Sequence, residues 1–413
     1  MISITDASEL IEANTPAPRT ERVPLQNAHH RVLAGDMSVP ELYPAFTRSL
    51  MDGYAVSSQA TASTSLNDKV ILRVVETLTA GQNSSLQIAS DQAVRIMTGA
   101  MLPGGCDCVV PQELAASVPD QPDTIQIPAS ARRPGASVLF EGALGRPGDP
   151  LLTAGTLLQP RHIAALAEFG ITDIPVARIP SAAIISTGSE LVPYQQSPPP
   201  GRLRNSSQPM LAALLHTMGA RVVSVQSAAD SPAELDAAIQ TGLQADLLLL
   251  TGGVSVGLLD LVPAALRRAG VQQLLHGVRL KPGKPLWAGV HHSSSDSRST
   301  LVFGLPGNPV SSLACCELFV RPSIRRLLGR PPAAPLAALL NHDFSLRGDR
   351  PVCQPAVASL QHSQLTVSIV PWQLSADLRS TAAANCMVLI EPSQSPLAVG
   401  SPVRTWLWDD QIS

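Results

Sequence analysis

The chain of 413 residues has few aromatic and few charged side chains. Phe, Trp and Tyr make up only 3% of the residues, so the hydrophobic cores must consist mainly of Leu, Val, Ile and Ala. Charged residues make up 15% and hydrophobic residues 45%, values typical of a globular chain and not of a disordered one. Because a single core rarely grows beyond about 300 residues, two to four domains are expected.

Other missing features exclude whole classes of protein. The net charge is −3 and no cluster of Lys and Arg is present, which argues against a nucleic-acid binder. No apolar run approaches the roughly 18 residues of a membrane span. The N-terminal segment mixes acids into its apolar positions and has no basic leader, unlike a signal peptide. We therefore expect a cytoplasmic protein that binds neither nucleic acid nor a membrane.

The six cysteines form neither a zinc motif nor a disulfide framework. They stand at positions 106, 108, 315, 316, 353 and 386, and no pair of C-x2-C motifs occurs. Cys315 and Cys316 lie in an apolar helical run, where buried thiols are expected. This usage agrees with a reducing compartment.

The order of helix-like and strand-like runs predicts a multidomain α/β protein. Four domains are expected: a discontinuous helical linker domain (1–41 and 144–178), a small β-rich domain (42–143), a central α/β domain (179–328) and a C-terminal β domain (329–413). In the central domain, strands alternate with helices, which predicts a mainly parallel sheet with right-handed crossovers. One helix should begin with Ser231 as N-cap and Glu234 as its capping-box partner, and a long helix should begin at Pro309. Ligands of such sheets bind at the carboxyl ends of the strands.

Three Gly/Pro-rich loops follow strands of the central domain. The first, Thr251–Gly257, contains Gly252, Gly253 and Ser255 and leads toward a helix, where backbone N–H groups can bind an anion. A glycine pair alone is more typical of an ordinary turn. The second, residues 281–285, places Lys281 and Lys284 three residues apart, which suits a multiply charged anion but also occurs in solvated basic turns.

The third loop, residues 304–311, includes Pro306, Asn308 and Ser311. Pro309 is suited to start the helix that follows, so the next N–H groups face a possible oxyanion. Three loops of this kind at the ends of neighbouring strands together favour a cleft for a phosphate or oxyanion.

Carboxylates flank these loops. Glu190 follows a strand, Asp230 precedes a helix and Asp260 ends the first loop. Acids beside an anion site suggest Mg²⁺, although Asp230 and Asp260 also suit helix-proximal turns or caps. In the small β-rich domain, Asp52 lies at a Gly turn before a strand and Thr98 at a turn after one, and each is by itself typical of a plain turn.

Taken together, the motifs resemble those of the MoeA family of molybdopterin molybdenumtransferases, to which the gephyrin E domain is related. The strings MDGYAV, RIMTGA, STGSEL, TGGVSVG, KPGKP and LPGNPVS occur in the order of that family. The resemblance covers nearly the whole chain and is densest between residues 184 and 322.

The resemblance implies an elongated homodimer of four-domain subunits. In it, the molybdopterin-binding α/β domain of one subunit faces the small β-rich domain of the other. It implies Mg²⁺-assisted insertion of molybdate into adenylylated molybdopterin with release of AMP. Molybdopterin adenylyltransferase and proteins of molybdoenzyme maturation are implied as partners.

The resemblance also assigns site residues. Asp52, Thr98, Glu190, Asp230 and Asp260 would be catalytic, the last three also holding the metal ion. Ligand-binding residues would be Gly252, Gly253, Ser255, Lys281, Lys284, Pro306, Asn308 and Ser311, with Arg350 and Ser380 from the C-terminal domain as the nearest matches to a family Arg and Ser.

This chain departs from the family pattern at three places: residues 139–144 lack the R-R-G-E-D string, Asn205-Ser206-Ser207 replaces D-T-N, and residues 47–50 replace D-N-S-A. An active transferase, with Arg48, Arg202 or Arg204 as substitute arginines, is the first hypothesis. A catalytically weak or inactive carrier or partner protein is the alternative. A related adenylyltransferase is a third, against which the flanking domains and MDGYAV argue.

Overall fold

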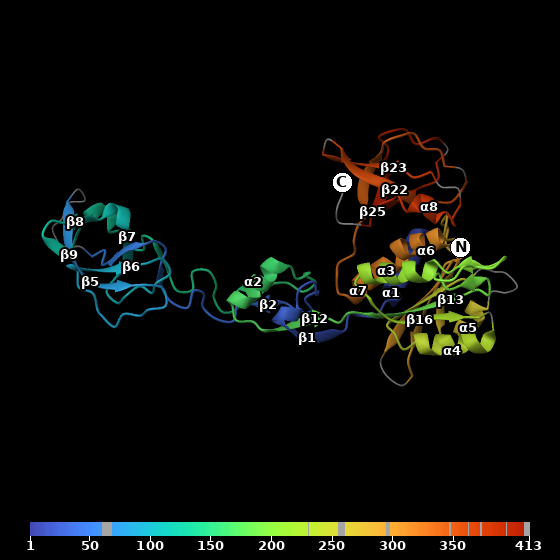
Figure 1. Ribbon diagram of the computed structural model, residues 1–413, viewed down its shortest axis with the longest axis horizontal. Helices are drawn as coiled ribbons and strands as arrows, with labels where there is room; N and C mark the ends of the chain where they lie inside the picture. The colour runs from blue at the N-terminus through green and yellow to red at the C-terminus, as the bar shows by residue number, and fades with distance from the viewer. Residues whose placement is uncertain are drawn as a thin grey trace.

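The computed structural model describes residues 1–59, 68–229, 231–254, 261–294, 298–346, 348–361, 363–371, 374–393 and 395–408. These residues form an elongated molecule, with a small β-rich part at one end and an α/β part carrying a β-barrel at the other (Figure 1). The predicted fold class, a central mainly parallel α/β domain with separate β-rich parts, is confirmed.

The small β-rich part contains a six-stranded sheet in the order β7-β4-β6-β5-β9-β8. Its strands are β4 (Gly53–Val56), β5 (Lys69–Leu78), β6 (Gln92–Ile96), β7 (Cys108–Pro111), β8 (Ala116–Val118) and β9 (Gln121–Pro128). Side chains alternate between two faces, so that Val94 packs into one core and Ala93 into the other. Beside this sheet, β3 (Arg48–Ser49) pairs with β10 (Val138–Leu139).

Segments far apart in sequence meet in the middle of the molecule. The paired strands there are β1 (Thr20–Pro24) with β12 (Asp173–Ala177) and β2 (Met37–Ser38) with β11 (Pro150–Leu152). Helix α2 (Pro160–Glu168) places Leu166 in a small core with Leu33 and Val176. The first helix, α1 (Ile4–Asn14), lies apart from this unit and packs on the α/β part, where Ala7 and Ile11 are buried.

The α/β part is built on a sheet in the order β16-β13-β17-β20-β19-β18. Its strands are β13 (Ser181–Thr187), β16 (Arg221–Ala228), β17 (Leu247–Thr251), β18 (Gln272–His276), β19 (Trp287–His292) and β20 (Ser299–Leu305). The four strands β16, β13, β17 and β20 are parallel, whereas β19 and β18 run antiparallel. A two-stranded ribbon, β14 (Leu191–Val192) with β15 (Leu203–Arg204), follows β13.

Helices cover both faces of this sheet. They are α3 (Ser207–Thr217), α4 (Pro232–Gly242), α5 (Val262–Arg268), α6 (Pro309–Cys315) and α7 (Arg321–Leu327). The side chains of β17 show which helices cover which face of the sheet. Leu247 and Leu249 pack toward α1, α3, α6 and α7, whereas Leu248 and Leu250 pack toward α4 and α5. Buried on both faces, β17 has a continuous leucine run instead of an alternating pattern.

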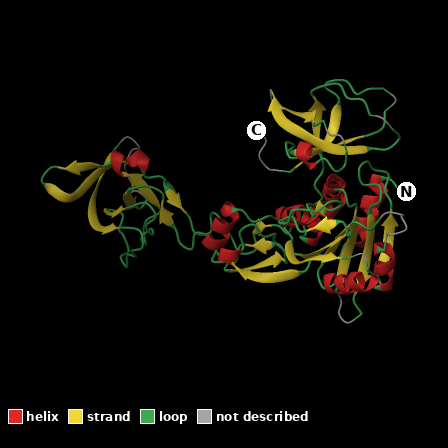
Figure 2. Ribbon diagram, turned by 45° about the vertical axis from the view of Figure 1, so that its right-hand side comes forward, coloured by secondary structure: helices red, strands yellow, loops and turns green. Residues whose placement is uncertain are grey.

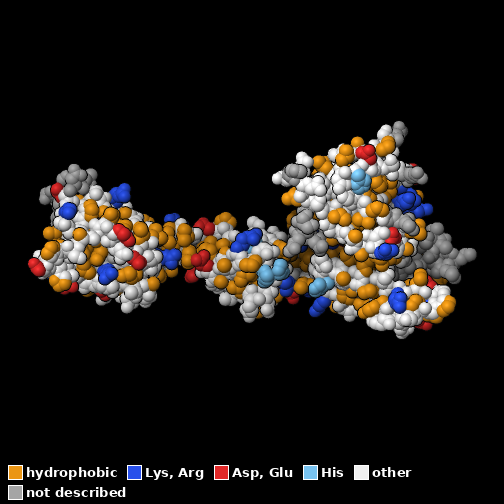
Figure 3. Space-filling view, turned by 45° about the horizontal axis from the view of Figure 1, so that its top comes forward, with side chains coloured by type: hydrophobic (Ala, Val, Ile, Leu, Met, Phe, Trp, Pro, Cys, Tyr) orange, Lys and Arg blue, Asp and Glu red, His pale blue; other side chains and the backbone are white. Residues whose placement is uncertain are grey.

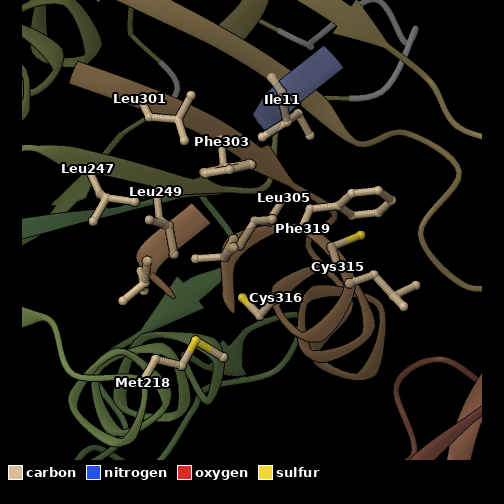
Figure 4. Close-up of a cluster of buried hydrophobic side chains, with 14 of the residues drawn as sticks. Ile11, Met218, Leu247, Leu249, Leu301, Phe303, Leu305, Cys315, Cys316 and Phe319 are labelled. Atoms are coloured by element: carbon tan, nitrogen blue, oxygen red, sulfur yellow. The ribbon is translucent and has the colours of Figure 1, made fainter. Parts of the chain in front are cut away.

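Figure 4 shows the larger of the two cores. Ile11 of α1 points toward Phe303 of β20, and Phe319 and Cys316 enter from the helical segment after β20. Cys315 and Cys316 are buried free thiols, as expected. Burial raises the pKa of both thiols, so they stay protonated and serve packing.

Two helices of the α/β part differ in detail from the sequence-based predictions. Ser231 does cap α4, its side chain accepting from the N–H of Glu234, but the Glu234 carboxylate accepts from Ala229 and not from Ser231. The single long helix expected from Pro309 is interrupted by a π-helical turn, Cys316–Val320. Pro322, at the start of α7, has no N–H to donate, and a proline ring commonly widens the preceding turn in this way.

The C-terminal part is a closed barrel in the order β21-β23-β22-β24-β25, and Figure 2 shows it beside the helices of the α/β part. Its strands are β21 (Leu336–Leu340), β22 (Val352–Gln361), β23 (Gln364–Ile369), β24 (Cys386–Ile390) and β25 (Pro402–Leu407). One short helix, α8 (Leu378–Thr381), lies between β23 and β24. Closure pairs every strand, which removes exposed sheet edges.

The described residues include no helix that is long and apolar enough to cross a membrane. On the face drawn in Figure 3, Lys and Arg side chains are scattered singly and do not form a continuous stripe. This distribution differs from the basic track that binds a nucleic-acid backbone.

Candidate anion cleft

The three Gly/Pro-rich loops meet at one edge of the α/β sheet. Strands β13, β17 and β20 are parallel and end in register, Ser186 opposite Thr251 and Thr251 opposite Leu305. Strand β19 is antiparallel and begins at this same edge, where Trp287 pairs with Gly304. The loop that carries the two lysines therefore lies beside the loops after β17 and β20.

Glycine is required where these loops touch. Gly252 has φ +85°, and a Cβ placed on it would lie 2.5 Å from the backbone oxygen of Thr187. A Cβ on Gly307 would lie 3.7 Å from the Cα of Gly252. The backbones after β13 and β17 thus approach more closely than a Cβ at Gly252 allows, whereas a Cβ at Gly307, after β20, would make an ordinary van der Waals contact. Gly253, at φ +60°, continues the left-handed turn.

The lysine loop is fixed by its backbone and leaves its charges in solvent. Lys281 and Lys284 are both exposed, whereas Gly283 between them is buried against Cys315. The N–H of Lys281 donates to the oxygen of Pro351 (2.9 Å), and its carbonyl accepts from the N–H of Cys353 (2.8 Å). These bonds anchor the loop to the C-terminal barrel, so two ammonium groups extend from a rigid support.

The barrel also borders the third loop. Asn308 donates from Nδ2 to Oγ of Ser375 (2.9 Å), and the N–H of Val310 donates to the backbone oxygen of Ser375 (3.1 Å). Nearby on α8, Ser380 donates from Oγ to Asp377 (2.7 Å). Arg350 donates to the backbone oxygen of Leu280, next to the lysine loop.

The remaining predicted residues of the cleft have different surroundings. Glu190 is exposed, and its carboxylate lies over Gly188, where a Cβ would be 2.7 Å from either oxygen. Pro306 accepts from the hydroxyl of Ser312 (2.6 Å). Ser311 is only 3% exposed, so its side chain lies within the first turn of α6 and not on the surface. Asp230, Ser255 and Asp260 lie outside the described residues.

Asp52 and Thr98 form a second constellation, in the small β-rich part. Asp52 precedes β4 and Thr98 follows β6, and these strands pair at Gly53 and Ile96. One oxygen of Asp52 accepts from both the N–H and the hydroxyl of Thr98, each at 2.7 Å. These bonds, the backbone one first, lower the pKa of Asp52. The pair is exposed and far from the cleft of the same chain (Figure 1).

The hydrogen bonds to Asp52 predict a measurable titration. Thr98→Ala removes the hydroxyl bond but keeps the N–H bond, so the pKa of Asp52 should rise without reaching its ordinary value. Because the folded pKa is depressed, Asp52 contributes stability above its unfolded pKa, and this contribution is lost as pH falls through the folded value. Carboxyl-carbon NMR titration of both proteins measures the shift. An unchanged pKa in Thr98→Ala would contradict the role of the hydroxyl.

Sequence reasoning did not single out three residues that shape the cleft. Thr187 donates from Oγ1 to the oxygen of Thr251 (3.1 Å) and supports Gly252, and His276 bonds the oxygen of Val254 (2.9 Å). Ser375 holds the third loop. Only Thr187 carries a local signal, since it precedes a glycine at a strand end. The other two reach the cleft through tertiary packing alone.

Two of the departures from the family pattern lie side by side. Arg48 pairs with Leu139 in the β3–β10 ribbon, and the N–H of Glu141 donates to Oγ1 of Thr47. Phe140 and Leu144 are 51% and 60% exposed. At the third departure, the side-chain oxygen of the buried Asn205 accepts from the N–H of Gln208 at the start of α3.

Comparisons with known proteins agree with this architecture. Residues 2–170 match the family profile described as MoeA N-terminal region (domain I and II), and residues 183–326 match that of a probable molybdopterin binding domain. A crystal structure of the molybdopterin biosynthesis MoeA protein of Pyrococcus horikoshii superposes with a TM-score of 0.84 at 29% identity, covering 100% of both chains.

Curated relatives extend the match over almost the full length. The molybdopterin molybdenumtransferase of Bacillus subtilis (strain 168) is 34% identical over 391 residues, covering 94% of this chain and 90% of that protein. Molybdopterin molybdenumtransferase 2 of Mycobacterium tuberculosis (strain ATCC 25618 / H37Rv) is 33% identical over 415 residues, covering 98% and 99%. The ordered motifs, the fold and these relatives show that the chain belongs to the MoeA family of molybdopterin molybdenumtransferases, a family of transferases.

Proposed function

We propose that this protein inserts molybdate into adenylylated molybdopterin and releases AMP, in the cytoplasm. The observation that carries the proposal is the convergence of three anion-competent loops at one sheet edge, with Lys281 and Lys284 exposed beside them. Molybdate is a dianion and the phosphoanhydride is also anionic, so fixed positive charge favours binding of both.

Different residues of the chain bind the oxyanion and the pterin phosphate. Lys281 and Lys284 hold the oxyanion, and Arg350 adds a third cation from the barrel side. The backbone at Gly252, Gly253 and Pro306 lets the pterin phosphate approach closely. Asn308, Ser255, Ser311 and Ser380 complete the ligand-binding set that the family pattern assigns. Ser311 acts through its backbone, because its side chain is buried.

Magnesium is consistent with the residues of this edge. Hard cations prefer carboxylate oxygens, and the exposed Glu190 supplies two of them at the end of β13. Glu190, Asp230 and Asp260 would hold the ion. Bound Mg²⁺ would neutralise charge on the phosphoanhydride. Among the described residues alone, no cluster of three ligand side chains forms, and Asp230 and Asp260 lie outside these residues.

The arrangement also supports a homodimer. Strand β6, which ends just before Thr98, and strand β13, which leads to the cleft, lie at opposite ends of one elongated chain (Figure 1). In a two-fold dimer with the subunits antiparallel, the small β-rich part of one copy would complete the cleft of the other. Arg48, beside the turn of Asp52, would then supply charge in place of the missing arginines. Donors and recipients of the cofactor are proposed as transient partners. The domain limits given above, with α1 packed on the α/β domain, are proposed as the units of this dimer.

The test of the transferase activity is AMP release. Purified protein mixed with adenylylated molybdopterin, molybdate and Mg²⁺ should release AMP, and omission of molybdate should stop it. Tight pterin binding with no AMP above background would instead support the second candidate, a catalytically weak carrier. The departures at residues 139–144 and 205–207 are the observation that favours that candidate.

The role of the lysines gives a separate prediction. Lys284→Ala should raise the molybdate concentration for half-maximal rate about tenfold, since removing one charge-assisted contact costs about 1.4 kcal/mol. Arg267→Ala, which removes an exposed positive charge from the last turn of α5, is the matched control. Molybdate titrations of AMP release measure both. An unshifted requirement in Lys284→Ala would refute its anion role.

A further inference from the structure

A second cavity, of about 650 Å³, lies away from the anion cleft. It is lined by the C-terminal end of α3, by α7, by residues 30–32 of the middle part and by the end of β25. Helices α3 and α6 start at the carboxyl ends of the parallel strands and run back along the sheet, and α7 continues α6. The cavity is therefore at the opposite edge of the sheet from Lys281 and Lys284.

The lining of this cavity is strongly basic. Its ionisable members are His30, Arg31, His216, Arg321, Arg325 and Arg330. Asp and Glu are absent from its lining in the described part of the chain. A cavity wall with four guanidinium groups and no carboxylate is unusual for a site that binds only water.

Among the residues that the structure describes, partner acids pair with two of the four arginines. Arg321 forms a bidentate pair with Glu317 (2.7 and 2.8 Å), and Arg31 pairs with Glu21. Within the described residues, no carboxylate lies within 4.0 Å of Arg325 or Arg330. Arg325 donates instead to the backbone oxygen of Pro331.

The simplest structural explanation is that these arginines stabilise helix ends. The C-termini of α3 and α7 both reach the cavity, and each carries about −0.5 charge. Two guanidinium groups without a carboxylate partner in the described part of the chain exceed that sum of about −1. Burial and then the neighbouring Arg330 and Arg321 lower the pKa of Arg325.

Apart from Thr217, the rest of the wall is mainly apolar. Ile179, Leu328 and Trp408 line it, and the indole N–H of Trp408 is shielded from solvent and has no acceptor among the described residues. A buried donor without an acceptor costs about 1–3 kcal/mol of folding free energy. A ligand acceptor that enters the cavity would recover this free energy once the indole ring rotates slightly toward it. A volume of this size accommodates an ordinary cofactor-sized ligand.

We propose that this basic cavity binds a small phosphorylated molecule that carries a flat ring, of the nucleoside di- or triphosphate class. Arg325 and Arg330 contact the phosphates, and the apolar wall with Trp408 contacts the ring. This site is separate from the anion cleft and does not depend on the proposed function.

The test measures binding of ATP and of inorganic tripolyphosphate by calorimetry at about 0.15 M ionic strength. The Lys281→Ala/Lys284→Ala protein serves as background, so that the cleft does not contribute. Both probes should bind to this background protein, and ATP should bind more tightly because its ring contacts the apolar wall. Adding Arg330→Gln should weaken both at least about tenfold, and Arg325→Gln should do the same. Adding Trp408→Leu should weaken ATP more than tripolyphosphate.

Two arginines serve as controls. Arg267 occupies the last turn of α5, an exposed helix end away from the cavity, and Arg326 borders only the neighbouring cavity beside Glu12. Arg267→Gln and Arg326→Gln in the same background should leave both affinities unchanged. Circular dichroism verifies the folding of each variant. Absence of binding to the folded background protein, affinity that survives Arg330→Gln and Arg325→Gln, or an equal loss in Arg326→Gln would overturn the proposal.

Discussion

Replacing Gly252 with alanine is expected to lower the rate of AMP release about 100-fold. The residue has φ +85°, and its new Cβ would lie 2.5 Å from the backbone oxygen of Thr187, which cannot move without moving β13. The loop after β17 must then shift away from the end of β13. Displacing binding groups by about 1 Å commonly costs about 100-fold in rate. Steady-state assays of AMP release at saturating molybdate measure the change.

Gly270→Ala is the matched control for this substitution. Gly270 also has a left-handed backbone, at φ +79°, but the nearest atom to its added Cβ is 3.9 Å away, in His291. In both variants, an alanine with a left-handed backbone lowers the free energy of unfolding by about 1–2 kcal/mol. Only Gly252→Ala adds the collision of its Cβ with the backbone oxygen of Thr187. Gly270→Ala should therefore lose stability but keep its rate. Equal rates in the two variants would show that the close approach at Gly252 has no part in catalysis.

The sequence predicted the α/β sheet well because the signals for it are local. The leucine run of β17, the cap at Ser231 and the start of α6 at Pro309 each depend on neighbouring residues only. Strand ends marked by glycine pairs identified the loops of the cleft, since parallel strands bring such ends together. The π-helical turn at Cys316–Val320 was not predicted, because it depends on how Pro322 disturbs a helix that the pattern alone leaves continuous.

The features of the cleft and of the basic cavity that the sequence did not predict depend on contacts between distant segments. Ser375 and His276 reach the cleft from the barrel and from β18, and no spacing rule relates them to the loops that they hold. The basic cavity is a similar case, because Arg31, Arg330 and Trp408 come from three parts of the chain. The separation of Asp52 from Glu190 is visible only once the elongated shape is known (Figure 1).

Glu317→Ala is expected to lower the free energy of unfolding by about 3–5 kcal/mol, the usual cost of breaking a buried ion pair. Glu317 is fully buried and accepts two hydrogen bonds from Arg321, whose side chain is 21% exposed. Without the carboxylate, the largely buried guanidinium of Arg321 would lose both of these hydrogen bonds, with the like charges of Arg325 and Arg330 nearby. Urea unfolding followed by tryptophan fluorescence and circular dichroism measures the loss.

Two comparisons separate lost pairing from lost volume. Glu12→Ala breaks an exposed ion pair, 3.5 Å long, with Arg326, which lies on the same helix as Arg321. This change should lower the free energy of unfolding by less than about 1 kcal/mol. Glu317→Leu/Arg321→Leu replaces the buried pair by apolar side chains and should recover most of the stability, because no charge is then left buried. If the double variant is as unstable as Glu317→Ala, the ion pair is not what Glu317 contributes. If it recovers, Glu317 is retained for charge balance at the wall of the basic cavity and not for packing.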